Sequence, residues 1–259
     1  MTAFSDYLES RITSWLKSSP FPSAPTAVYC GLFDGDPTDS GTAATEVTTD
    51  INTGGRVAIT FGATNDGTIT NSAQVDFGAS ANATSVSHFG VYDSQTSGNL
   101  LFHAPLASSR SINSGDPVLF SINNLTVTVG GKLSDYLENA LADWTKGTAF
   151  PSAPSDVYCA LYDGDPTDTG TAGVEVTGSV NSTGRVAIPL GIPSNGVVSN
   201  NADVDFGNSD GTVSISHIGI FDAQSGGNLL IHSPLTVTRT INTSDPVKFT
   251  SGNITITVD

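Results

Sequence analysis

A short acidic sequence is the part of this chain whose residue types could bind a cation. Asp34, Asp36 and Asp39 lie in Asp-Gly-Asp-Pro-Thr-Asp, and oxygen ligands at alternate positions are what a hard ion such as Ca²⁺ takes. A calcium loop would continue to a glutamate at its twelfth position, and this sequence lacks that pattern. Pro37 also prevents the chain from curving around an ion as such a loop does. We therefore favour a turn in which aspartates accept backbone N–H groups and proline fixes the corner. The same choice applies to the copy of this sequence at Asp163, Asp165 and Asp168.

The histidines form two similar pairs that offer a second kind of chemistry. His88 lies in Ser-His-Phe-Gly and His103 in Phe-His-Ala-Pro-Leu, and His217 and His232 have matching surroundings. If the two strands of a pair are neighbours, its histidines could bind a transition metal or titrate near neutrality. No third ligand has recognisable spacing, so we favour hydrogen-bonded packing residues and predict no metal and no cofactor.

The sequence gives little support to nucleophilic catalysis. A Gly-x-Ser-x-Gly elbow is absent, and Cys30 and Cys159 fall in the middle of predicted strands, where thiols are usually buried and inert. Two cysteines do not make a disulfide framework, so free thiols are favoured over a bridge between them. Two facing carboxylates of a glycosidase cannot be assigned among the many acids. We predict that the protein is not an enzyme.

All these candidates come in pairs because the chain consists of two tandem copies of one sequence module. The landmarks recur at a constant offset of 129 residues, as from Cys30 to Cys159 or from Arg56 to Arg185. Units of about 130 residues have the usual size of an independent core. We predict two domains, residues 1–130 and 131–259, joined at the paired glycines of Val-Gly-Gly-Lys.

Each module begins with a predicted amphipathic helix. In residues 4–17 the apolar side chains recur at helical spacing behind Ser5, a suitable N-cap, and the same stripe follows Ser134 in the copy. The helix is expected to stop at the proline-rich segment that follows. Because an exposed apolar face is unfavourable, the stripe must cover the end of its own domain or a neighbouring subunit.

The remainder of each module is predicted to be antiparallel β structure. Short runs rich in Val, Ile, Thr and aromatic residues alternate with Gly, Asn, Asp and Pro at intervals of about 10 residues, which is typical of a β-sandwich or jelly roll. The fold class is therefore mainly β, with two tandem sandwiches. In the first module the predicted strands are residues 28–33, 56–61, 68–77, 84–92, 100–106, 118–122 and 125–129.

The charge of the chain limits its partners. Its 25 acids and 9 bases give a net charge of −16, which would repel nucleic acid and anionic membranes. No apolar run approaches the ~18 residues that span a bilayer, and the first residues lack the features of a signal peptide. We expect a soluble protein that is neither inserted in a membrane nor exported by the general route.

An ordered set of motifs resembles a family of small virion proteins of tailed bacteriophages. The set comprises Ser-Asp-Tyr-Leu-Glu, Val-Tyr-Cys-(Gly/Ala)-Leu-(Phe/Tyr)-Asp-Gly-Asp-Pro-Thr-Asp, Gly-Arg-Val-Ala-Ile, Ser-His-(Phe/Ile)-Gly and Gly-Asn-Leu-Leu, in both modules. The family is usually called tail-fibre-like. Its members look like single modules, so the duplication is a departure. The resemblance implies a structural protein of the virion, assembled in the cytoplasm of a bacterial host.

Two functions compatible with this resemblance stay open. The first is a tail- or neck-associated fibre-like component or a capsid decoration (cement) protein, forming a homo-oligomer with other virion proteins as partners. The second is a receptor-binding module for a host surface glycan or protein. The aromatic residues fall mostly within strands, which favours assembly. We predict that polar replacement of the helix stripes leaves the sandwich folded and stops incorporation into particles; the predicted interface residues are Leu8, Ile12, Trp15, Leu137, Leu141 and Trp144.

Overall fold

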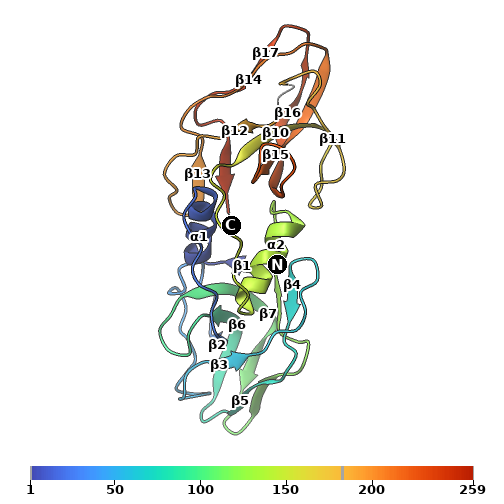
Figure 1. The fold of residues 1–259 in the computed structure, drawn as a ribbon. Coiled ribbons are helices and arrows are strands. Elements are labelled where there is room, and N and C mark those ends of the chain that lie inside the picture. The colour runs from blue at the N-terminus through green and yellow to red at the C-terminus, as the bar shows by residue number, and fades with distance from the viewer. Residues whose placement is uncertain (1, 182–183, 259) are drawn as a thin grey trace.

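The structure is a computed structural model that describes residues 2–181 and 184–258. Its two repeat units, which we call module 1 (residues 2–130) and module 2 (residues 131–258), lie at opposite ends of an elongated molecule, and the two helices lie between them (Figure 1).

The two modules contain nearly the same succession of elements. Module 1 consists of β1 (Ala3–Phe4), α1 (Asp6–Leu16), β2 (Val28–Phe33), β3 (Val57–Ile59), β4 (Thr68–Thr70), β5 (Val75–Ala79), β6 (Thr84–Tyr92), β7 (Leu100–Ile112), β8 (Pro117–Phe120) and β9 (Thr126–Thr128). Module 2 consists of α2 (Asp135–Thr145), β10 (Tyr158–Asp163), β11 (Val174–Glu175), β12 (Val186–Ala187), β13 (Val197–Ser199), β14 (Val204–Asn208), β15 (Val213–Phe221), β16 (Leu229–Ile241), β17 (Pro246–Phe249) and β18 (Thr255–Thr257).

Each module is an open, sandwich-like arrangement of antiparallel strands. In module 1 a sheet with the order β1-β7-β6-β2-β3 is accompanied by two ribbons, β4-β9 and β5-β8. In module 2 the sheet has the order β11-β10-β15-β16, with β12 also on β10, and the ribbons are β13-β18 and β14-β17. The prediction of a mainly β protein with two tandem sandwich-like modules, each with one helix at its start, is confirmed.

The helix starts follow from their capping residues. Ser5 is extended, accepts a hydrogen bond from the Leu8 backbone N–H at 3.3 Å, and donates its hydroxyl to the Leu100 carbonyl at 2.5 Å. One side chain therefore both caps α1 and fixes it to strand β7. Ser134 does the same for α2, with Leu137 and Leu229 as its partners.

Two of the predicted strands differ most from the structure, while those at 56–61, 118–122 and 125–129 differ by one or two residues at their ends. Residues 68–77, predicted as one run, form β4 and β5 in separate ribbons, because the buried Asn71 turns the chain between them. Its side-chain amide donates to the carbonyls of Ala73 and Ser121, and its Oδ1 accepts from the Leu125 N–H. The strand predicted at 100–106 continues to Ile112 as β7.

The hydrophobic core is continuous through both modules. One cluster of buried apolar side chains includes strand residues of module 1, both helices and strand residues of module 2. The two repeat units are therefore packed against each other through a shared core, and are not connected by the peptide chain alone.

Candidate interaction surfaces

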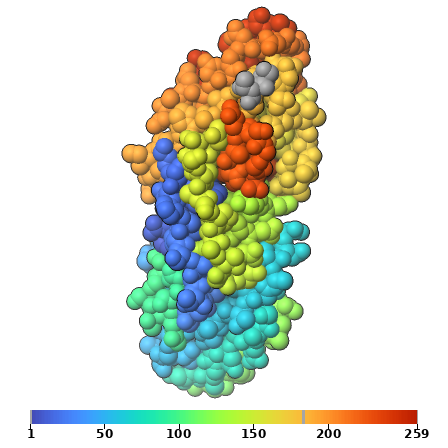
Figure 2. Space-filling view, viewed as in Figure 1, coloured from blue at the N-terminus to red at the C-terminus, as the bar shows by residue number. Residues whose placement is uncertain are grey.

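The two helices lie side by side across the middle of the molecule. Figure 2 shows the N-terminal segment and the segment around residues 130–155 in contact there. Helix α1 contacts β1 and β7 of its own module and β13 of module 2, while α2 contacts β16 of its own module and β4 of module 1. We use the name inter-module joint for α1, α2 and the two Phe-Pro-Ser-Ala-Pro segments, residues 21–25 and 150–154.

Aromatic side chains fill the centre of the inter-module joint. Phe21 and Phe150 are equivalent in the repeat, and their rings stack on each other with centroids 4.0 Å apart. Trp15 meets Phe150 edge-on at 5.2 Å, and its equivalent Trp144 meets Phe21 at 5.1 Å. Contact between two equivalent residues, flanked by a reciprocal pair, is the arrangement found about a local two-fold axis.

The tryptophans also make reciprocal hydrogen bonds across the joint. Trp15 Nε1 donates to the Pro151 carbonyl at 2.9 Å, and Trp144 Nε1 donates to the Pro22 carbonyl at 3.0 Å. Both indoles are at most 2% exposed, and a buried indole N–H needs such a partner. The proline-rich segment cannot continue the helix. The carbonyls of Pro22 and Pro151 are therefore not used in helical hydrogen bonds and can accept from the indoles.

The helix stripes lie inside the chain. All six residues predicted as an interface with other subunits or virion components are buried by the two modules of this chain, at 0–2% exposure. Polar replacement would place polar groups in the core, so we now expect it to disrupt the fold itself rather than to leave the sandwich intact. The six residues are Leu8, Ile12, Trp15, Leu137, Leu141 and Trp144.

A buried glutamate of each helix lies under a turn of the opposite module. Glu138 on α2 packs on Gly67, whose N–H donates to Asn139 Oδ1 at 3.0 Å. Gly67 has φ +66° and a Cβ there would lie 2.8 Å from Glu138 Cβ, so only glycine fits. The counterpart is Glu9 against Gly196, where a Cβ would lie 2.6 Å from the carboxylate.

The surroundings of Glu138 favour its neutral form. Burial, and to a smaller extent the nearby acids Asp168, Asp135 and Asp66, raise the pKa of this carboxyl to about 7. In the unfolded chain the same group has its ordinary pKa near 4.5. Between these two values the unfolded chain loses this proton and the folded chain keeps it, so stability falls as the pH rises.

We expect the free energy of unfolding to decrease from pH 5 to pH 7 and then to level off above pH 7. Glu138→Gln should remove a part of this decrease on the order of 1 kcal/mol, because glutamine does not ionise. Urea unfolding at several pH values measures it. Asp210→Asn, which removes an exposed acid in module 2, is the control for net charge. A decrease of the same size in wild type and Glu138→Gln would contradict the assignment.

The acidic turn of module 1 holds a histidine. Asp36 Oδ1 accepts from the Thr38 N–H and Asp34 Oδ1 from the Thr45 N–H, both at 2.9 Å. The imidazole of His103 lies between two carboxylates, with Nδ1 3.2 Å from Asp36 and Nε2 2.9 Å from Asp39. Because these carboxylates face opposite ring nitrogens, they do not converge on one point that an ion could occupy.

The turn of module 2 repeats this arrangement. Asp165 accepts from the Thr167 N–H at 2.9 Å, and His232 lies 3.2 Å from Asp165 and 2.8 Å from Asp168, while Asp163 ends strand β10. Within residues 2–181 and 184–258, no group of three or more His, Cys, Asp or Glu side chains is placed to hold a metal ion. The two remaining histidines, His88 and His217, bond through Nδ1 to the hydroxyls of Ser87 and Ser216.

The two cysteines are free and fully buried. Cys30 in β2 and Cys159 in β10 are 0% exposed and are not bridged. Burial raises the pKa of both thiols well above its usual range, which keeps them protonated and unreactive. The predicted free buried thiols are confirmed.

An arginine in each module holds the long loop that follows β2 in module 1 and β10 in module 2. In the sequence this arginine stands out only as a repeat landmark. Arg56 makes two parallel bonds to Glu46, Nε–Oε1 and Nη2–Oε2, both 2.8 Å long. Its guanidinium also lies 3.2 Å from the centroid of the Tyr92 ring. In module 2 the equivalent residues Arg185, Glu175 and Phe221 are arranged alike.

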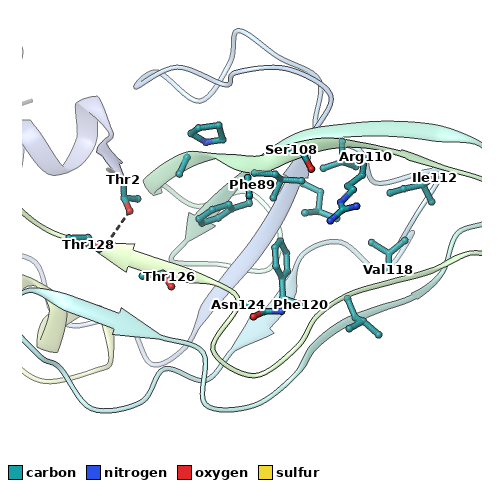
Figure 3. A pocket seen from close by; sticks show the side chains of 17 residues that line it. Thr2, Phe89, Ser108, Arg110, Ile112, Val118, Phe120, Asn124, Thr126 and Thr128 are labelled. Atoms are coloured by element: carbon teal, nitrogen blue, oxygen red, sulfur yellow. Dashed lines mark hydrogen bonds between the residues drawn. The ribbon is translucent and has the colours of Figure 1, made fainter.

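Module 1 contains an open groove between its sheet and its ribbons. The groove has a volume of about 640 Å³. Figure 3 shows Phe89 and Phe120 near each other among its lining side chains, together with Arg110 and Asn124. The β6–β7 pairing shifts from His88↔Pro105 to Val86↔Arg110, so β7 bulges along the groove. Strand β1 covers only Phe102 and His103 on the other side of β7. A proline and a bulge protect the remaining free edge of β7 from adding further strands.

The groove is not repeated equally in module 2. The cavity there is only about 70 Å³ and is lined by residues of β15, β16 and β18, including Ile218 and Thr255. These positions are equivalent to the groove residues Phe89 and Thr126, so the same region of the module is much less open. At the positions equivalent to the groove residues Ser108 and Leu119, module 2 has the larger Val237 and the charged Lys248, which pairs with Asp203 at 3.0 Å. The two modules have therefore diverged in this region.

Comparison with known families explains the repeat. A family model described as podophage GP4 fiber I protein gp80 matches the chain twice, over residues 3–128 and 132–257. The chain belongs to this family. The double match confirms the resemblance to phage tail-fibre-like proteins and the tandem duplication of their module. Comparison with curated proteins gives no match to this chain.

Membership of a phage fibre family identifies the chain as a structural component of the virion, associated with other virion components. In the part of the chain that the structure describes, neither helix has the length and apolar character needed to cross a membrane. In the described part of the chain, the candidate sites of this fibre protein are thus two acidic turns that hold a histidine and one groove, while the inter-module joint is buried.

Proposed function

We propose that the chain is a non-enzymatic building block of a phage particle, acting as a tail- or neck-associated fibre-like component or as a capsid decoration (cement) protein. The observation that supports this proposal is the inter-module joint. It connects two similar modules through one shared core, so that their outer ends point in opposite directions (Figure 1). Such a block can bridge two sites on a particle at a fixed separation.

We also propose that residues 1–130 and 131–259 are the two structural domains and that the chain forms a homo-oligomer. Three chains would present six similar modules, which suits a six-fold tail component or a hexameric capsomer. No chemistry is required of the acidic turns in this role, because their carboxylates already accept hydrogen bonds from backbone N–H groups and lie against histidines.

Imaging of the virion tests this proposal. Cryo-electron microscopy of particles that carry a tagged chain should show its density on the tail, neck or capsid surface, with a fixed number of copies about each axis. Particles prepared without the chain should lack that density and be less stable or less infectious. Purified particles that never contain the chain would contradict the proposal.

The groove of module 1 supports a second candidate, a receptor-binding module for a host glycan or protein. Ligand sites are commonly concave and apolar with a few polar groups, and Phe89, Phe120 and Arg110 provide that combination. If the groove binds a receptor, Arg110→Ala should weaken adsorption of the purified protein to host cells at least about tenfold, the loss of one charged hydrogen bond. The control Arg239→Ala alters the equivalent position of module 2 and should have little effect. Equal adsorption by both variants and wild type would exclude the groove as the receptor site.

A further inference from the structure

The inter-module joint has the properties of an interface between two identical proteins. Phe21 stacks on its own equivalent, Phe150, and every tryptophan contact is present in both directions, as Trp15 with Pro151 and Trp144 with Pro22. A surface that is complementary to itself about a two-fold axis is characteristic of homodimers. A packing contact between two unrelated domains of one chain would have no reason to show this reciprocity.

The contacts of the joint have the composition of an interface that binds strongly. Its centre consists of fully buried tryptophans with satisfied N–H groups and stacked phenylalanines, and buried aromatic residues near the middle carry most of the binding energy in stable interfaces. Around them lie polar contacts between the modules. Asn139 Oδ1 accepts from the Gly67 N–H at 3.0 Å, and Ser18 Oγ donates to the Ser155 carbonyl at 2.8 Å.

The peptide connection contributes little to these contacts. It runs from β9 through Gly130 and Gly131 to Lys132, none of which takes part in the aromatic cluster. Gly131 is exposed, and a Cβ at this position would have no atom within 4 Å. The connection therefore acts mainly by keeping the two modules at a high local concentration.

We propose that the helix face and the Phe-Pro-Ser-Ala-Pro segment of each module form a docking surface for a second copy of the module, so that the chain is a fused homodimer whose halves stay together without the peptide connection. Fusion then has one specific effect. It forces module 1, which has the groove, to pair with module 2, which has Lys248 at the position equivalent to the groove residue Leu119. The two kinds of module therefore always occur in equal numbers.

Cleavage of the full chain tests this proposal. A protease recognition sequence is inserted between Gly130 and Gly131, the folded protein is cut, and its mass is measured by size-exclusion chromatography with light scattering. We expect the cut protein to keep the mass of the intact chain at concentrations down to about 1 μM, because stable interfaces with good central contacts hold at this concentration. Separation into half-size species, or precipitation after cutting, would overturn the proposal.

A second variant shows whether the joint is what holds the cut halves together. With Phe21→Ala and Phe150→Ala, the protein should remain a single species before cutting and lose its full-size species after cutting. Val237→Ser, at an exposed position outside the joint, should behave as the wild type. If the cut double variant stayed at full size like the control, the contact would lie elsewhere and the proposed docking surface would be wrong.

Discussion

Trp15→Ala is expected to lower the free energy of unfolding by about 3–5 kcal/mol, the usual loss when a fully buried large aromatic side chain is removed. The replacement leaves a cavity against Phe150 and an unpaired carbonyl at Pro151, and both effects are unfavourable. Urea unfolding followed by circular dichroism measures the change. Because the chain contains only two tryptophans, fluorescence of the remaining Trp144 reports on the joint itself.

Two further variants make the test of Trp15 specific. Trp15→Phe keeps part of the ring and loses only the N–H bond and some volume, so its loss should be smaller than that of alanine. The combination of Trp15→Ala with Trp144→Ala should cost less than the sum of the single changes, since both tryptophans pack on the Phe21–Phe150 stack and shared partners make effects non-additive. A loss below about 1 kcal/mol for Trp15→Ala would contradict its place in a shared core.

Arg56→Ala is expected to have the second largest effect, a loss of about 3 kcal/mol, because removing one partner of a largely buried ion pair leaves the other charge uncompensated. The Arg56 side chain is 10% exposed, binds Glu46 through two nitrogens and covers the ring of Tyr92. Thermal or urea unfolding measures the loss, and limited proteolysis should cut the loop of residues 34–56 in the variant faster than in wild type.

The control variants for Arg56 separate charge from geometry. Arg56→Lys keeps the charge but not the two parallel bonds, so it should be intermediate. Combining Arg56→Ala with Glu46→Gln should recover part of the loss, because no buried charge is then left unpaired. Arg11→Ala, which removes an exposed arginine over Tyr7, should change stability by less than about 0.5 kcal/mol. Equal effects at Arg11 and Arg56 would show that the pair has no special role.

Local rules allowed much of the fold to be predicted. Ser5 and Ser134 were predicted as N-caps and are N-caps, because capping depends on neighbours within three residues. The strands at 28–33 and 84–92 have the predicted limits, since both are rich in Val, Thr and aromatic residues. The prediction failed where a distant residue decides, as at Asn71, whose amide binds Ser121. It failed also at residues 107–112, a mostly polar stretch whose last three residues pair with β6.

The candidate sites show the same division. The free thiols at Cys30 and Cys159 followed from their position in apolar strands. The pairing of Asp36 and Asp39 with His103 did not, because these groups are more than 60 residues apart in the chain. The pairing of Arg56 with Glu46 could not be predicted beyond the repetition of both residues. An arginine and a glutamate ten residues apart in a loop often make no contact with each other.

The sequence by itself determined that this chain is two copies of one β module with an N-terminal helix, and that the chain is related to phage tail-fibre-like proteins. Repetition, capping and alternation are properties of neighbouring residues, so they are visible without coordinates. Only the tertiary structure decided what the helix stripes cover. An apolar stripe requires a partner surface but carries no information on which one. Here each helix packs both on its own module and on the other one, and Phe21 and Phe150 meet where the two copies come together.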